Sequence, residues 1–330
     1  MEPTCNISTN DYQKQVQAIL CLNAFDHLCI EAKGRFKIVP LKGIDLIRFL
    51  YADTLDRELN DIDLLICPAE KALEFVEILL KEGYRPEFDF AMDRAALNEK
   101  KKISMLSPSQ QRPHVDVHLA LITKRFFSST INNFNSDAMS RLIRQNEVVW
   151  VLEEVDRWLF LAAHLAFHFL EGGKWYGDLS LLANQMSEQQ FNTLINRTKQ
   201  YNLQRIVGAV CTRMEEQYPE ITAHIPLRQI LPDRSGKRFI QYIRFMAIHP
   251  NCLGHGLHVA RYYWEFLFIS QYGQRFQSFL RLLFPSLGKM QNMYRCHAIP
   301  AIFMYLPHVL LNVVGLLLFT IQYVVISNTR

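Results

Sequence analysis

Two aspartates, Asp61 and Asp63, begin an apolar run that continues to Ile66 and stops at Pro68. An apolar run of this length that ends at a proline is typical of a strand buried on both faces. Because strand side chains alternate between the two faces, both carboxylates point the same way, roughly 6.5 to 7 Å apart. They repel each other and are costly to desolvate, and a divalent cation would remove both costs. Taken alone, the pair is also explained as two solvated side chains at a strand end.

The segments around this strand alternate between helical and extended patterns. Apolar residues recur at helical spacing, and a glycine follows two of the helical stretches. The helix after the strand is expected to bury Leu73, Val76 and Leu80 and to end at Gly83. The predicted order is helix, strand, helix, strand, helix, over residues 11–34, 36–41, 44–51, 62–66 and 69–83.

A hairpin is predicted farther along the chain. Residues 101–107 and 114–121 alternate with a period of two, and turn-forming residues separate them. The second of these strands carries Asp116, and His114 and His118 share its face. A third acid on a neighbouring strand would allow the site to hold a second metal ion.

Beyond residue 150 the pattern is helical, without a repeat of fixed period. We therefore predict an α+β protein in which a small mixed-sheet core is followed by an α-helical domain. The predicted divisions are an α/β core with an N-terminal helix over 1–148, a helical domain over 149–297, and an apolar C-terminal helix over 298–330.

Cationic groups accompany the acids. Lys42 and Gly43 stand between a predicted strand and a predicted helix. Backbone N–H groups and the positive end of a helix dipole favour phosphate at such a turn. Arg57, four residues before Asp61, adds a forked cation suited to the same anion.

The arrangement resembles the nucleotidyltransferase superfamily with its polymerase-beta-like core, and more closely the bacterial family called uncharacterised nucleotidyltransferase. That family has L-K-G, then L-Y, then R, then D-I-D-L-L. The matching residues here are Leu41-Lys42-Gly43, Leu50-Tyr51, Arg57 and Asp61 to Leu65. Later elements of the pattern match Asp116-Val117-His118, the spaced histidines of 164–168, and Asp178 to Leu182. The resemblance covers roughly residues 35 to 185.

The resemblance implies transfer of a nucleoside monophosphate, or a related phosphate-linked group, from an NTP such as ATP to an acceptor. The resemblance also implies that Asp61, Asp63 and Asp116 are the catalytic and metal-binding residues, with Mg²⁺ or Mn²⁺ as the metal. Lys42, Gly43 and Arg57 would bind the phosphates, and His118 and Lys174 would be accessory residues. The Gly-Ser of the wider superfamily is Gly43-Ile44 here, so Lys42 would replace the phosphate contact of that serine.

Two other functions remain open on the sequence. A metal-dependent glycosyltransferase would also use D-x-D, to hold Mn²⁺ against a nucleotide-sugar diphosphate. Such enzymes usually place a nucleotide-binding half before the motif, and only about sixty residues precede it here. A non-catalytic nucleotide sensor or partner-binding protein is the second alternative. The acceptor, whether a protein, peptide, sugar or small molecule, is not indicated by any segment.

Net charge and cysteine content restrict the possible partners and cellular compartment of the protein. A net charge of +4 over 330 residues is too small to indicate a protein that coats nucleic acid. The seven cysteines form no C-x-x-C pair, which is typical of reduced thiols in the cytoplasm. The N-terminus lacks the features of a signal peptide, so a cytoplasmic protein is expected.

The C-terminal region suggests contact with a membrane. Residues 296–329 contain no Asp, Glu, Lys or Arg, and residues 231–297 before them carry nine basic residues against two acids. The apolar run 309–326 approaches the length of a spanning helix. A terminal helix packed in the helical domain would also explain it. The preceding positive charge favours association with the inner face of a membrane through residues 300–328.

Overall fold

The computed structural model describes residues 9–32, 34–52, 57–87, 102–109, 112–122, 129–168, 170, 173–217 and 219, and positions 280, 283–284, 303, 305–311, 313–314 and 317. The chain divides into two compact units. The first comprises residues 1–123, 134–161 and 174–186, and the second comprises residues 124–133, 162–173 and 187–330. The domain boundary at residue 148 stays a prediction. Nearly all of the basic segment 231–297 lies outside the described residues.

A mixed sheet forms the centre of the first unit. Its strands are β1 (Lys37–Leu41), β2 (Asp61–Cys67), β3 (Arg85–Pro86), β4 (Lys102–Leu106) and β5 (His114–His118). Over the described residues they are ordered β1-β2-β5-β4-β3, with β2 and β5 parallel and the other neighbours antiparallel. The predicted mixed sheet and the predicted hairpin, β4–β5, are therefore confirmed.

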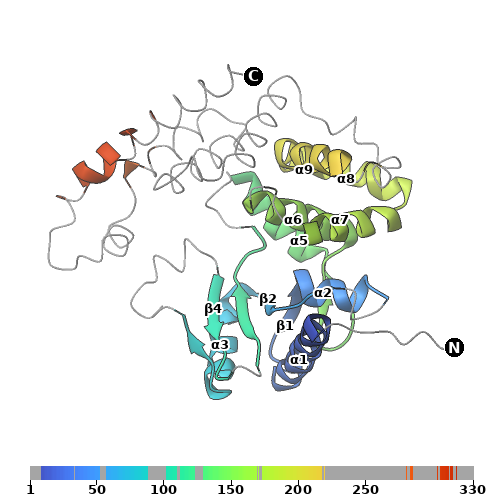
Figure 1. The fold of residues 1–330 in the computed structure, drawn as a ribbon, viewed down its shortest axis with the longest axis vertical. Helices are drawn as coiled ribbons and strands as arrows, with labels where there is room; N and C mark the ends of the chain where they lie inside the picture. Colours follow the sequence, from blue (N-terminus) through green and yellow to red (C-terminus); the bar gives the residue numbers. More distant parts are fainter. Residues whose placement is uncertain are drawn as a thin grey trace. The chain divides into compact units, whose positions relative to one another are not determined.

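Helices precede, interrupt and follow these strands (Figure 1). The helices up to β3 are α1 (Thr9–Glu31), α2 (Lys42–Phe49), the 3₁₀ turn Ala69–Lys71 and α3 (Ala72–Lys81). After β5 come α5 (Ser129–Ser140), the short paired strands β6 (Ile143–Arg144) and β7 (Trp150–Val151), α6 (Glu154–Phe167), α7 (Gly173–Gln185), α8 (Glu188–Gln200) and α9 (Gln204–Gln217). A sheet followed mainly by helices confirms the predicted α+β class.

The two faces of the sheet differ in character. One face is apolar and packs with α1 and α3 into a hydrophobic core. Its strand residues are Ile38, Ile62, Leu64, Ile66, Ile103, Met105, Val115 and Val117. Because strand side chains alternate, the residues between them lie on the opposite face, and these include both aspartates of β2. Beyond Asp61, β2 is buried on both faces, and its acids lie on the face opposite the hydrophobic core.

Helix α3 buries a different stripe from the one expected. Val76 is buried as predicted, but Leu73 and Leu80 are 50% and 45% exposed, so the prediction for these two leucines is wrong. The helix buries Ala72, Phe75, Val76, Ile78 and Leu79 instead. The Phe75 ring packs edge-on against Phe36, with centroids 5.8 Å apart. Two apolar stripes coexist in this helix, and the larger aromatic contact selects one.

The apolar C-terminal segment is described only at some positions, and 305–311 are helical there. Within the part of the chain that the structure describes, none of the helices combines the length and apolarity needed to cross a bilayer.

Candidate metal centre

The parallel pairing of β2 and β5 brings the predicted acids together. Asp63 lies beside Asp116 in the register, Asp61 lies beside His114, and Leu65 lies beside His118. Directly paired residues on neighbouring strands project to the same face. The acids and both histidines therefore share the polar face of the sheet, as their spacing predicted.

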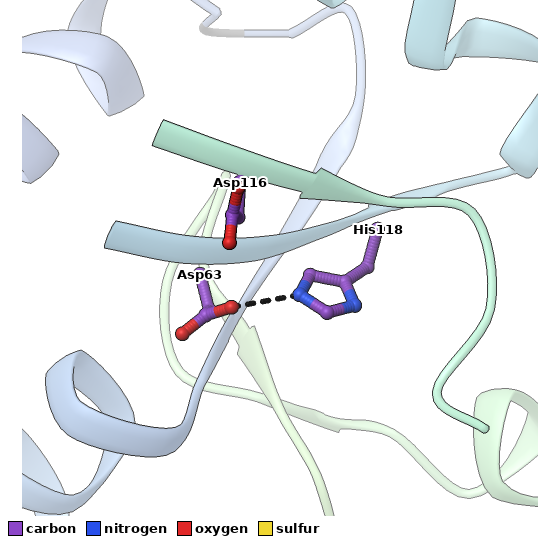
Figure 2. Close-up of side chains that lie close together, drawn as sticks. All are labelled: Asp63, Asp116 and His118. Carbon is purple, nitrogen blue, oxygen red and sulfur yellow. Dashed lines mark hydrogen bonds and ion pairs between the residues drawn. The ribbon is translucent and has the colours of Figure 1, made fainter. Parts of the chain in front are cut away.

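Asp63, Asp116 and His118 form the tightest group. One ligand atom of each lies within 4.8 Å of the others, so these residues could hold a metal ion. Figure 2 shows the His118 ring directed at Asp63, and its Nε2 lies 2.8 Å from Asp63 Oδ1. Asp63 and His118 are buried, and Asp116 is half-buried. Two carboxylates and one imidazole are a donor set that divalent metal ions accept in proteins.

Asp61 lies at the exposed end of β2 and outside this group of three. Partial burial and the negative charge of Asp63 raise the pKa of Asp61 above its ordinary value. Close like charges that raise a carboxyl pKa are the situation that a bound cation relieves. A role for Asp61 as a metal ligand stays a prediction.

Two lysines neutralise the acidic group. Lys42 Nζ donates to Asp63 Oδ1 over 2.5 Å, and Lys102 Nζ donates to Asp116 Oδ2 over 2.6 Å. Lys42 follows β1, whereas Lys102 opens β4, on the other side of the two acid-bearing strands. Lys102 was not among the residues expected at the site. Lys102 lies two residues before Ser104, so the two side chains share a face of β4, and Ser104 pairs with Asp116. This alternation is the sequence signal that could have identified Lys102 as a site residue.

The protonation states follow from this network. Burial opposes the charge on Asp63, but Lys42 and the hydrogen bond with His118 hold the pKa of Asp63 well below its ordinary range. Burial lowers the pKa of His118, so its imidazole is neutral at pH 7. Burial also acts against the charge on Lys102, yet Asp116 and the other two acids raise its pKa. At neutral pH the site therefore combines an ionised Asp63 carboxylate with a neutral His118 imidazole, the forms of these two side chains that coordinate metals.

The turn between β1 and α2 is tightly packed. Lys42 has a φ of 50°, in the left-handed region, and Gly43 follows it buried. A Cβ at Gly43 would lie 2.3 Å from Leu59 Cδ1 and 2.7 Å from Arg57 Nη1, so only glycine fits there without movement. The predicted strand–glycine–helix turn is present, at the N-terminus of an amphipathic helix. Phosphate binding by Lys42 and Gly43 stays a prediction.

Arg57 is held by an acid far along the chain. Its Nε and Nη2 donate to the two carboxylate oxygens of Asp178 on α7, both over 2.8 Å. Tyr51 Oη also donates to Asp178, over 2.7 Å. The side chains of Arg57 and Asp178 are 5% and 0% exposed. This bidentate pair, the Arg57–Asp178 clamp, fixes the segment that leads into β2, and phosphate binding by Arg57 stays a prediction.

A second buried ion pair supports α2 from α6. Arg157 Nε lies 2.7 Å from Asp45 Oδ2. Burial raises the pKa of Asp45 to about 6, although the charge of Arg157 acts in the opposite direction. The helix that begins at the Lys42–Gly43 turn is thus tied to the helical part of the same unit.

Lys174, expected as an accessory residue, lies exposed in the first turn of α7. Its Nζ lies 5.9 Å from the centre of the Trp175 ring. Its accessory role stays a prediction, and so does that of His118, whose position beside Asp63 was described above.

Comparison with known families agrees with the motifs. The model of a family described as "Uncharacterised nucleotidyltransferase" matches residues 10–219, which include the acidic group and the Arg57–Asp178 clamp. A search among curated proteins finds no match. The resemblance inferred from the motifs is confirmed by the family match.

Proposed function

Because the chain belongs to the uncharacterised nucleotidyltransferase family, we propose that it transfers a nucleoside monophosphate from an NTP to an acceptor hydroxyl with the help of Mg²⁺ or Mn²⁺. Membership of the family implies an NTP substrate. The observation that carries the proposal is the side-by-side placement of Asp63 and Asp116 on parallel strands, with Lys42 hydrogen-bonded to Asp63.

The proposed reaction is an in-line displacement at phosphorus. The acceptor oxygen forms a bond to the α-phosphorus, and the bond between that phosphorus and the α,β-bridging oxygen breaks. The electron pair of the broken bond leaves with pyrophosphate, and the acceptor proton passes to water. A bound divalent cation would neutralise charge on the phosphates and on the leaving group.

The residues of this chain contribute mainly position and charge. Asp63 and Asp116 would hold the cation, with Asp61 at the open end of the same face. Lys42 would exchange its contact with Asp63 for one with a phosphate oxygen, and the backbone N–H of Gly43, in the first turn of α2, would be a further donor. Positioning and charge neutralisation supply most of the catalysis in phosphoryl transfer.

Isothermal titration of the full chain with each NTP and Mg²⁺, combined with an assay for released pyrophosphate, tests the proposal. Binding of at least one NTP with pyrophosphate release in the presence of a cell lysate is expected. Binding without release would indicate a nucleotide sensor. A preference for nucleotide sugars over NTPs would indicate a glycosyltransferase. Either result would overturn the nucleotidyltransferase proposal.

We also propose that this cytoplasmic enzyme contacts the inner face of a membrane through residues 300–328. The segment lacks Asp, Glu, Lys and Arg. Apolar side chains are more than half exposed at several of its described positions, namely Phe303, Leu306, Leu310, Leu311 and Leu317. Such side chains, next to a basic segment, suit the boundary between headgroups and acyl chains.

The variant Leu306→Asp/Leu310→Asp is expected to bind vesicles containing anionic lipid at least about tenfold more weakly than the wild type, because each acid opposes burial in lipid and is repelled by the headgroups. Vesicle flotation measures the effect. Leu73→Asp, which places an acid at a half-exposed leucine of α3, is the control and should bind as the wild type does. Equal flotation of the double variant and the wild type would refute membrane contact through this segment.

A further inference from the structure

Lys102 is placed to act on whatever binds over the acidic group. It pairs with His118 in the antiparallel register of β4 and β5, so its side chain lies on the polar face of the sheet. Its Nζ is 2.6 Å from Asp116 Oδ2. The side chain is 38% exposed, compared with 14% for Lys42. Lys102 is therefore the more accessible of the two lysines at the site.

In the free protein Lys102 balances part of the charge of the acidic group, but its ion pair is not needed to hold β4 in the sheet. A pair with a partly exposed lysine contributes modestly to the free energy of folding, because water screens the charges and the long side chain loses rotamer freedom. The neighbouring apolar residues of β4, Ile103 and Met105, are buried in the core and anchor the strand without it. A contribution to ligand binding is the better physical explanation for a lysine at this position.

The charges of the site favour an anion between the lysines. Asp61, Asp63 and Asp116 carry three negative charges and Lys42 and Lys102 carry two positive ones, so one divalent cation would make the group net positive. In the sheet order β1-β2-β5-β4, Lys42 approaches from the β1 side and Lys102 from the β4 side. An anion bound over Asp63 and Asp116 would have an ammonium group on each side.

We propose that Lys102 is a phosphate-binding residue, which holds the triphosphate of the NTP from the side opposite Lys42. The inference rests on the proposed nucleotidyltransferase function and assigns the second phosphate contact to Lys102 in place of Arg57. The guanidinium of Arg57 already gives Nε and Nη2 to Asp178 and is 5% exposed. The Lys102 ammonium has only to leave one half-buried carboxylate to reach a phosphate oxygen.

If Lys102 binds phosphate, its replacement should weaken nucleotide binding and strengthen metal binding. In Lys102→Met the affinity for a magnesium–nucleotide complex should fall about 10- to 100-fold, because a charge-assisted hydrogen bond to phosphate is lost. The affinity for Mn²⁺ alone should rise, on the order of 3- to 10-fold, because a positive charge beside Asp116 is removed. A lysine needed only for the fold would lower both affinities together.

The test uses the full chain and two titrations. Mn²⁺ binding without nucleotide is followed by electron paramagnetic resonance. Binding of α,β-methylene analogues of the four NTPs with Mg²⁺ is followed by calorimetry. Lys81→Met, at an exposed lysine of α3, is the matched control and should change neither affinity. Lys102→Arg should retain most of the nucleotide affinity, and Lys102→Gln replaces the methionine variant if that protein does not fold.

The outcomes separate this inference from the proposed function. Weaker nucleotide binding together with tighter Mn²⁺ binding supports the role of Lys102. Unchanged nucleotide affinity in Lys102→Met, while the wild type binds, overturns the role of Lys102 and leaves the proposed function in place. A fall in both affinities also overturns it. Absence of nucleotide binding by the wild type overturns both proposals.

Discussion

Replacement of Asp63 by asparagine is expected to reduce the rate of nucleotidyl transfer by about 10³-fold or more, since metal-assisted charge stabilisation supplies several kcal/mol in the transition state. Asp63 is central in the site because it is hydrogen-bonded to Lys42 and lies 2.8 Å from His118 Nε2. An amide keeps the volume of the carboxylate but loses its charge. Pyrophosphate release with saturating NTP and Mg²⁺ measures the effect.

The fold must be shown to survive this change. Circular dichroism of Asp63→Asn should give a spectrum like that of the wild type, because the apolar face of β2 is untouched. Thermal unfolding should still show a cooperative transition, at a lower temperature than in the wild type, because Lys42 loses its charged partner. Glu77→Gln makes the same chemical change at an exposed acid of α3 and should retain full activity. If Asp61→Asn and Asp63→Asn both keep full activity, the catalytic role of these acids is wrong.

Loss of the Arg57–Asp178 clamp is expected to cause the largest change in stability. Asp178→Ala leaves the Arg57 guanidinium buried without its two carboxylate oxygens, and breaking a buried pair in this way costs about 3 to 5 kcal/mol of the free energy of unfolding. Tyr51 Oη loses its hydrogen bond to Asp178 in the same variant. Urea denaturation followed by circular dichroism measures the loss.

Two further variants test the cause of this loss. Asp26→Ala removes one partner of the solvent-exposed ion pair between Asp26 and Arg48. This change should lower the free energy of unfolding by no more than about 1 kcal/mol. The double variant Arg57→Met/Asp178→Leu removes both charges and should recover most of the stability lost in Asp178→Ala. A double variant as unstable as Asp178→Ala would show that the buried charge is not the reason.

The acidic site was predictable from sequence because it depends on local alternation. The spacing of Asp61 and Asp63, and of Asp116 and His118, fixes the faces of two strands wherever those strands pair. The same alternation along β4 would also have placed Lys102 on the face that carries the acids. The parallel pairing that sets Asp63 beside Asp116 joins strands between which α3, β3 and β4 lie in the sequence, and no local pattern specifies it.

Contacts over long sequence separations were not predictable. Arg57 and Asp178 are 121 positions apart, and each alone is compatible with a solvent-exposed or ligand-binding role. Their bidentate contact exists only because α7 packs in the same unit as the sheet. The exposed Leu73 and Leu80 of α3 have a similar cause, because packing of Phe75 against Phe36 selects one of two apolar stripes.

The most direct test of nucleotidyl transfer is the fate of the two ends of the triphosphate. The full chain is incubated with Mg²⁺, a cell lysate and an NTP radiolabelled at either the α- or the γ-phosphate. Transfer as proposed predicts that the α-label becomes attached to an acceptor, while the γ-label is released as pyrophosphate, and that Asp63→Asn abolishes both events. Attachment of the γ-label with release of the α-label in a nucleoside diphosphate would contradict the account, because the reaction would then be phosphoryl transfer.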